Sequence, residues 1–249
     1  ISYTHNDEKI VDLPDGDLIA KKLFEGHPIK TFYDFKYAGI WSTAEEEEAA
    51  KYGCQPGYVK IETVEQFTTD ENGNLVGDAG VHTYSNTRDL QILGSNVPDG
   101  ILGVNNTFKY RDFDLSVFAI VRYGQMIDSK TIGWYSANGN NQPRGTNYWT
   151  PENQSAYFPR PGIASTTGIG SLKYIDGSYA KIKNITLGYT FPKKLCKTLG
   201  LEQCRLYATA YNVFVLPFKS ELKHSDPENN GSDTFTLYKT YLLGLNVSF

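Results

Sequence analysis

The end of the chain, from Tyr241 to Phe249, alternates between apolar and polar positions. The apolar set is Tyr241, Leu243, Leu245, Val247 and Phe249, and the residues between them are Leu242, Gly244, Asn246 and Ser248. Because successive side chains of a β-strand point to opposite faces, this pattern predicts a strand with one apolar face and one mostly small or polar face. A half-buried strand of a soluble sandwich and a lipid-facing strand of a transmembrane barrel share this pattern, so the segment alone leaves both open.

The same period of two recurs in other segments. One face of 114–123 carries Leu115, Val117, Ala119, Val121 and Tyr123. In 179–191 the outward set is Ile185, Leu187, Tyr189 and Phe191, facing Asn184, Thr186, Gly188 and Thr190. The alternation is less regular in 205–215, and Asn106 interrupts the apolar face of 102–110. These patterns predict about seven strands, near 1–9, 31–40, 101–110, 113–124, 179–191, 203–215 and 237–249.

The connections between these strands fall into two length classes. If the strands alternate in direction and the chain ends on the periplasmic side, the short connections 111–112 and 192–202 are periplasmic, and 10–30 is the longest periplasmic connection. The long connections near 41–100, 125–178 and 216–236 are then extracellular. Short turns on one side and long loops on the other are typical of outer-membrane barrels. We therefore predict an all-β chain that contributes strands to an antiparallel transmembrane β-barrel.

Aromatic residues refine this expectation. They make up 14% of the chain, with 18 Tyr and 13 Phe, which favours strands over helices. In a barrel, aromatic side chains gather in girdles at the two membrane interfaces. The residues predicted to lie there are Tyr189, Phe191, Tyr207, Tyr211 and Tyr241. The apolar face that ends on Phe249 is also the surface that such a barrel presents to lipid and to its assembly machinery.

Charge and hydropathy exclude other classes. The net charge is −4 and both signs are spread along the sequence, so there is no basic field to bind nucleic acid. No apolar run is long enough for a transmembrane helix, whereas a barrel strand needs only alternation over about 9–11 residues. Residues 1–6 are polar and show neither the charged start nor the apolar stretch of a signal peptide, so we expect the chain to be a segment of a longer polypeptide.

Short runs along nearly the whole chain carry a family resemblance. They are Gly26-His27-Pro28-Ile29, Gly39-Ile40-Trp41, Pro56-Gly57, Gly94-Ser95-Asn96-Val97-Pro98, Phe113-Asp114-Leu115-Ser116-Val117-Phe118, the run from Tyr179 to Pro192, Arg205-Leu206-Tyr207, Asn212-Val213-Phe214, Asp226-Pro227-Glu228 and the ending from Leu243 to Phe249. In this order they resemble the SusC/RagA family of TonB-dependent outer-membrane transporters from Bacteroidetes.

The resemblance implies a plugged barrel with about 22 strands, of which residues 1–249 are the C-terminal segment. The plug, the TonB box and most strands would then lie in the missing N-terminal part. It further implies a place in the bacterial outer membrane and import of nutrients, oligosaccharides first and peptides second. A SusD-like surface lipoprotein would close over the substrate, and TonB would act through the plug. Two alternatives remain: a passive porin-like channel, and a secreted β-sandwich that binds carbohydrate.

Large aromatic residues are frequent in the long connections. The candidates for contact with substrate or lid are Trp41, Trp134, Tyr135, Tyr148, Trp149 and Tyr157. They lie among Asn, Gln, Gly and Arg, and aromatic faces beside amide and guanidinium donors suit stacking on sugar rings or packing on a peptide. The alternative is that these rings pack the connections against each other or against a partner.

One acidic segment has oxygen side chains at calcium-loop spacing. Its candidate ligands are Asp70, Asn72, Asn74 and Asp78. Leu75 stands where a calcium loop needs Gly, and Val81 where it needs the bidentate Glu, so a hairpin tip at Asn72-Gly73 explains the same residues. We expect no cofactor, with calcium as the one weak candidate.

No catalytic set emerges from the sequence. The His residues have no nucleophile or paired acid at motif spacing, and no glycine-rich phosphate loop is present, so we expect no enzyme activity. An oxidising envelope would allow Cys196 and Cys204 to pair, although free or buried thiols are the commoner outcome, and the sequence leaves this open.

Overall fold

The computed structural model describes residues 1–64, 67–69, 75–77, 84–136, 145–162, 168–234 and 237–249. The chain divides into two compact units. The first, here called the sheet unit, consists of Ile1–Asp7, Val97–Gln125 and Asp176–Phe249. The second, here called the loop unit, consists of Glu8–Asn96 and Met126–Ile175. Two of the long connections therefore fold together as a unit of their own.

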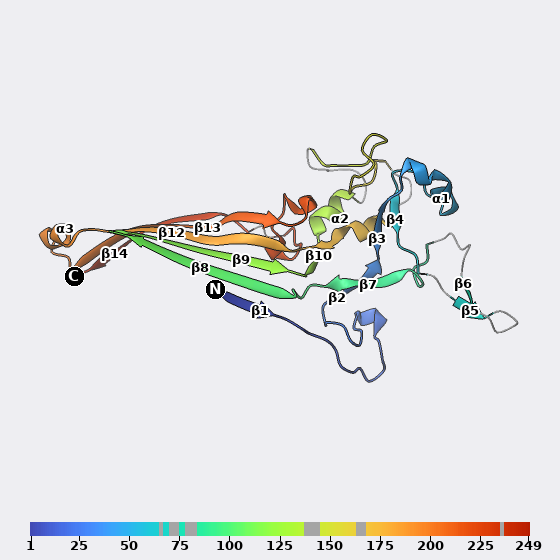
Figure 1. Cartoon of the computed structure of the whole chain (residues 1–249), viewed down its shortest axis with the longest axis horizontal. Helices are drawn as coiled ribbons and strands as arrows, with labels where there is room; N and C mark the ends of the chain where they lie inside the picture. Colours follow the sequence, from blue (N-terminus) through green and yellow to red (C-terminus); the bar gives the residue numbers. More distant parts are fainter. Residues whose placement is uncertain (65–66, 70–74, 78–83, 137–144, 163–167, 235–236) are drawn as a thin grey trace. The chain divides into compact units, whose positions relative to one another are not determined.

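The sheet unit is built on one six-stranded antiparallel sheet in the order β1-β8-β9-β12-β13-β14 (Figure 1). Its strands are β1 (Ser2–His5), β8 (Gly100–Tyr110), β9 (Phe113–Tyr123), β12 (Tyr179–Thr190), β13 (Gln203–Pro217) and β14 (Thr240–Ser248). A short helix, α3 (Lys193–Thr198), lies between β12 and β13, and two 3-10 turns, η4 (Ser220–Leu222) and η5 (Pro227–Asn229), lie between β13 and β14. The strands predicted near 101–110, 113–124, 179–191, 203–215 and 237–249 are confirmed.

The strand register aligns the apolar positions of neighbouring strands. Leu243 pairs with Ala208, which pairs with Leu187, and the same row continues through Leu115 to Phe108. The next row is Leu245, Leu206, Tyr189, Phe113 and Tyr110. Paired residues of an antiparallel sheet point to the same side. The alternation of each strand therefore adds up to one apolar face across β8, β9, β12, β13 and β14.

A bulge explains why 205–215 alternates poorly. Ile182 pairs with Phe214, but Asn184 pairs with Tyr211, so β13 contains an extra residue at this point. Asn212 has φ 53°, the left-handed conformation that Asn tolerates better than most residues. The apolar face continues beyond the bulge on β13 at Phe214, which pairs with Ile182, and at Leu216, which pairs with Ala180.

The first long connection differs from the expectation. β1 pairs directly with β8, with His5 opposite Gly100. All of 6–99 is therefore one connection between two adjacent strands, and 10–30 is part of it instead of a periplasmic connection. The segment 31–40 was predicted as a single barrel strand, and this is wrong: it divides into β2 (Thr31–Phe35) and β3 (Tyr37–Ile40). At Lys36, between them, the carbonyl accepts the Glu62 N–H at 2.9 Å, and the chain changes partner strand.

The loop unit consists of short paired strands and short helices. β2 pairs with β7 (Leu90–Ser95), β3 with β4 (Val59–Ile61), β10 (Met126–Asp128) with β11 (Tyr174–Asp176), and β5 (Phe67–Thr69) with β6 (Leu75–Gly77). The helical elements are η1 (Ile19–Lys21), η2 (Thr43–Glu45), α1 (Glu46–Lys51), α2 (Lys130–Ser136) and η3 (Ile169–Lys173). Ser42 and Glu45 form a capping box at η2, which leads directly into α1. No described helix has the length and apolar character needed to cross a membrane.

Candidate functional site

The face of the sheet opposite the apolar one is polar. Its members include Asp114 and Ser116 on β9, Asn184, Thr186 and Gly188 on β12, Arg205, Tyr207 and Thr209 on β13, and Asn246 on β14. The Thr186 and Thr209 hydroxyls are 2.9 Å apart and hydrogen-bonded across neighbouring strands. In a transmembrane barrel with an apolar outer band, such a face lines the interior.

An ion pair on this face spans two strand neighbours. Arg205 Nε donates to Asp114 Oδ1 at 2.9 Å, although β12 lies between their strands. The side chains meet above Gly188, where an added Cβ would lie 2.2 Å from the Arg205 guanidinium. The absence of a side chain at Gly188 thus leaves room for the two charged groups to meet, and a larger residue would displace them.

The register corrects two of the predicted girdle residues. Tyr207 pairs with Gly244 and Gly188, and Tyr211 pairs with Asn184, so both tyrosines point to the polar face. The Tyr207 ring covers Gly244, where an added Cβ would lie 2.3 Å from a ring carbon. Tyr189, by contrast, shares the apolar face, with ring centroids 4.7 Å from Phe113 and 5.2 Å from Phe191. The sequence predicted all these aromatic residues on the lipid-facing girdles, but the strand register places them on two different faces of the sheet.

A buried lysine connects the polar face to the 218–239 connection. The Lys181 side chain on β12 is completely buried, and its Nζ lies 2.5 Å from Asp226 Oδ2 and 2.6 Å from Glu228 Oε2. Lys183 forms a second ion pair with Glu228. The cluster thus contains two cations and two carboxylates. This balance matters because an unpaired buried charge costs several kcal/mol.

The local fold of η5 presents both carboxylates to Lys181. Asp226 is its N-cap and accepts the Glu228 N–H at 3.0 Å, and Pro227 occupies the first turn, where the missing N–H costs nothing. Burial raises the pKa of Glu228, but hydrogen bonds from Lys181 and Lys183 outweigh this effect and hold the pKa below its usual value. The connection is therefore fastened to the sheet by an ionised carboxylate.

The predicted aromatic contacts of the loop unit divide by burial. Trp41 and Trp149 are only 2% and 4% exposed, so their rings pack the unit and are not open for stacking on a ligand. Trp41 packs with Ala49, Cys54 and Tyr58, and Lys60 Nζ lies 4.3 Å from the centroid of its ring. For these two tryptophans the structure supports the packing alternative over direct contact.

The remaining candidates differ in accessibility. Tyr148 is 43% exposed and keeps an accessible ring. The partly buried Tyr157 donates its hydroxyl proton to the Leu172 carbonyl at 2.6 Å, and its ring centroid lies 5.0 Å from that of Tyr37. Trp134 and Tyr135 belong to α2, but their side chains lie outside the described part.

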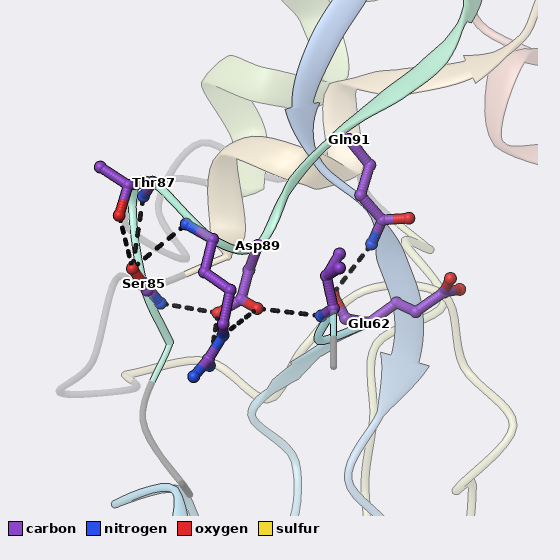
Figure 2. A network of polar contacts seen from close by, with 7 residues as sticks. Glu62, Ser85, Thr87, Asp89 and Gln91 are labelled. Atoms are coloured by element: carbon purple, nitrogen blue, oxygen red, sulfur yellow. Dashed lines mark hydrogen bonds and ion pairs between the residues drawn. The ribbon is translucent and has the colours of Figure 1, made fainter. Parts of the chain in front are cut away.

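A polar clasp, which the sequence did not reveal, holds the two ends of the segment 65–84 together (Figure 2). Fully buried Asp89 accepts the Val64 N–H at 3.0 Å and the Ser85 N–H at 2.7 Å. Arg88 completes the site with Nε 2.8 Å from Asp89 Oδ1 and a second nitrogen 2.9 Å from Oδ2. Nearby, Gln91 donates to the Glu62 carbonyl at 3.2 Å. Burial raises the pKa of Asp89, but these donors outweigh it and lower the pKa overall.

The metal and cysteine candidates have separate outcomes. Asp70, Asn72, Asn74 and Asp78 all lie outside the described residues. Among the residues that are described, no group of three or more His, Cys, Asp or Glu side chains could hold a metal ion. Cys196 and Cys204 are buried free thiols, as is Cys54.

Several known proteins are similar to this chain in sequence or in fold. TonB-dependent receptor P3 of Formosa agariphila is 26% identical over the whole chain, which covers 26% of that protein. SusC of Bacteroides thetaiotaomicron is 28% identical over 75% of the chain, which covers 18% of SusC. The RagAB peptide importer in its open-open state superposes with a TM-score of 0.66 at 20% identity, over 99% of this chain and 26% of that one.

In sequence the chain is similar to TonB-dependent receptors, SusC among them, and in fold it is similar to RagAB. No family model matches it. It spans about a quarter of the length of the TonB-dependent receptors P3 and P26. The likeness to RagAB shows that the six-stranded sheet has the fold of part of a transporter barrel. The proteins that match the chain in sequence are TonB-dependent receptors.

Proposed function

We propose that this chain forms part of the barrel wall and of the external vestibule of a TonB-dependent nutrient importer. One observation carries the proposal: the register joins the apolar positions of five neighbouring strands, β8, β9, β12, β13 and β14, into one face and leaves charged and polar groups on the other. A wall between lipid and a polar interior needs this division. A soluble sandwich would cover the apolar face with a second sheet.

The missing part of the polypeptide would supply the plug and the remaining strands, and TonB would act through the plug. We assign the loop unit to the extracellular side, where long connections are usual. A SusD-like surface lipoprotein would dock there as the lid. Support comes from the buried cluster of Trp41, Ala49, Cys54 and Tyr58, which gives the loop unit a core of its own.

Oligosaccharides are the first candidate cargo, because Tyr148 exposes its ring in a connection rich in Asn, Gly and Arg. Peptides are the second candidate. This alternative is supported by the RagAB structures, which are described as a peptide transporter and importer. Both classes would use the same wall and the same lid.

Uptake by the full-length receptor tests the proposal. Cells that carry the receptor as their sole copy are given labelled oligosaccharides and, separately, labelled peptides, with TonB present or deleted. We expect accumulation of one class that is lost without TonB and reduced without the lipoprotein. Uptake that persists without TonB would identify a passive porin-like channel instead. Equal uptake of both classes with and without the receptor would refute import.

A further inference from the structure

The turn between β12 and β13 carries an exposed group of cations. Lys193, Lys194 and Lys197 lie on α3, all three are exposed, and none forms an ion pair with a described residue. The Thr190 N–H donates to the Asp112 carbonyl at 2.8 Å, which fixes this turn beside the turn between β8 and β9. Arg111, in that second turn, adds a further cation.

The helix α3 is amphipathic. Leu195 and Leu199 are four residues apart and are 47% and 65% exposed. Lys193 and Lys197 are also four residues apart, and at about 100° per residue they lie on the opposite side of the helix from the leucines. Lys193 and Lys197 line a hollow of about 600 Å³ together with the acidic Glu202 and with Thr190, Gln203 and Ser248 of the polar face.

Buried contacts hold this arrangement in place. Cys196, between the two pairs, is buried, its Sγ lies 3.7 Å from the Phe191 carbonyl, and its own carbonyl accepts the Leu201 N–H at 2.9 Å. The helix is therefore anchored through Cys196, and its leucines are left without cover. The division of the sheet into an apolar and a polar face thus continues into the turn.

The sheet ends here in an aromatic band. Phe113, Tyr189 and Phe191 are in ring contact on the apolar face, and the exposed Tyr110 lies beside Arg111, whose guanidinium carbon is 5.4 Å from the ring centroid. Aromatic side chains on a lipid-facing surface mark the depth of the headgroups. The exposed cations therefore lie next to the level at which lipid phosphates occur.

We propose that α3 and Arg111 form a binding site for anionic glycerophospholipid headgroups, with the leucines inserted among the acyl chains and the lysines on the phosphates. The site rests on the proposed function for its place in the periplasmic leaflet. The lysine stems reach along the apolar surface while their ammonium groups remain at the polar boundary. Each such cation near an anionic surface contributes roughly a fivefold gain in affinity at low to physiological salt.

The test uses the assembled full-length receptor in nanodiscs that contain phosphatidylethanolamine and increasing fractions of phosphatidylglycerol. Retention of labelled phosphatidylglycerol is measured for the wild type and for the triple variant K193Q/K194Q/K197Q. The matched control is K219Q/K223Q/K239Q, three exposed lysines of the 218–239 connection at the other end of the sheet. Heat-modifiable migration confirms assembly of each variant, and the charge-keeping variant K193R/K194R/K197R serves if the glutamine variant assembles poorly.

We expect affinity for phosphatidylglycerol to fall roughly tenfold or more in the glutamine variant, to be unchanged in the control and in the arginine variant, and to weaken with salt. Equal affinity in wild type and glutamine variant would overturn the site, as would an equal loss in the control. Preferential retention of lipid A would overturn the assigned leaflet. TonB-dependent uptake is measured separately. If the receptor shows the lysine-dependent preference for phosphatidylglycerol but no uptake, only the proposed function is refuted.

Discussion

The sheet unit and the loop unit are rich in the same aromatic and aliphatic residues, but these residues have different surroundings. In the sheet unit Leu187 and Leu243 lie exposed on a face that strand pairing alone creates. In the loop unit Trp41 is buried in a cluster with Ala49, Cys54 and Tyr58, and Trp149 is buried beside Gly57. Burial therefore follows backbone register in one unit and tertiary packing in the other. In the proposed barrel an exposed leucine of the sheet unit would face lipid, whereas an exposed ring of the loop unit would be available for a ligand or partner.

The largest effect is expected when a buried charge of the sheet unit is removed. Lys181→Met leaves Asp226 and Glu228 with only Lys183 as a cationic partner. Breaking such a buried pair costs roughly 3–5 kcal/mol. We expect the 218–239 connection to detach and to be cleaved much faster in limited proteolysis of the assembled receptor. Lys239→Met, at an exposed position, is the control. Equal cleavage rates for the two variants would contradict the role of the Lys181 ion pairs in holding this connection to the sheet.

A second pair of substitutions tests the faces of β12. Leu187→Lys places a charge on the apolar face at a cost of roughly 2–4 kcal/mol near the middle of a membrane. Thr186→Lys, at the neighbouring position, points to the polar face and should be tolerated. The amount of heat-modifiable, assembled barrel on a gel measures both. If the two variants assemble equally well, the facing of the strand is wrong by one residue.

Sequence periodicity predicted the sheet unit better than the loop unit for a physical reason. A period of two is local, so the ranges and the apolar face of β9, β12 and β14 could be predicted from their own residues. The bulge at Asn212 could not, because it depends on how β13 pairs with β12. The direct pairing of β1 with β8 could not be predicted from local pattern either. The segment 31–40 has the composition of a barrel strand, but its first part pairs with β7 in the loop unit.

The candidate site shows the same limit. Asp226 and Glu228 lie in one of the short runs that carry the family resemblance. Their partner Lys181 is 45 residues from Asp226, and no rule of sequence spacing connects them. Burial likewise separated Trp149 from Tyr148, although the two are adjacent in sequence. The Asp89 clasp joins Val64 to Ser85 across 65–84, and the only sequence signal for it was the neighbouring Arg88.

The clasp allows a smaller test inside the loop unit. Asp89→Asn removes the charge that holds Arg88 and weakens the bonds from the Val64 and Ser85 amides, at a cost of roughly 1–3 kcal/mol. Because the folded pKa of Asp89 is lowered, its contribution is present above the ordinary value of 3.8 and is lost as the pH falls through the folded pKa. Proteolysis near residues 62–91 measures the effect, with exposed Asp15→Asn as control. A variant as resistant as the wild type at neutral pH would exclude this role.

The smallest effect on stability is expected at Tyr148. A substitution there tests whether an exposed ring of the loop unit contacts cargo or lid. Its exposed ring contributes little to packing, so Tyr148→Ala should change stability by no more than about 0.5 kcal/mol. Trp149→Ala, one residue further, should cost roughly 3–5 kcal/mol because the indole is buried. If the ring binds cargo or lid, Tyr148→Ala lowers TonB-dependent uptake or recovery of the lipoprotein in a pulldown while assembly stays normal. Tyr148→Phe keeps the aromatic face and should retain both activities, which separates stacking from a role of the hydroxyl. Normal uptake and normal pulldown for Tyr148→Ala would show that exposure in the loop unit does not by itself mark a contact, and the remaining support for recognition by this unit would come from its fold alone.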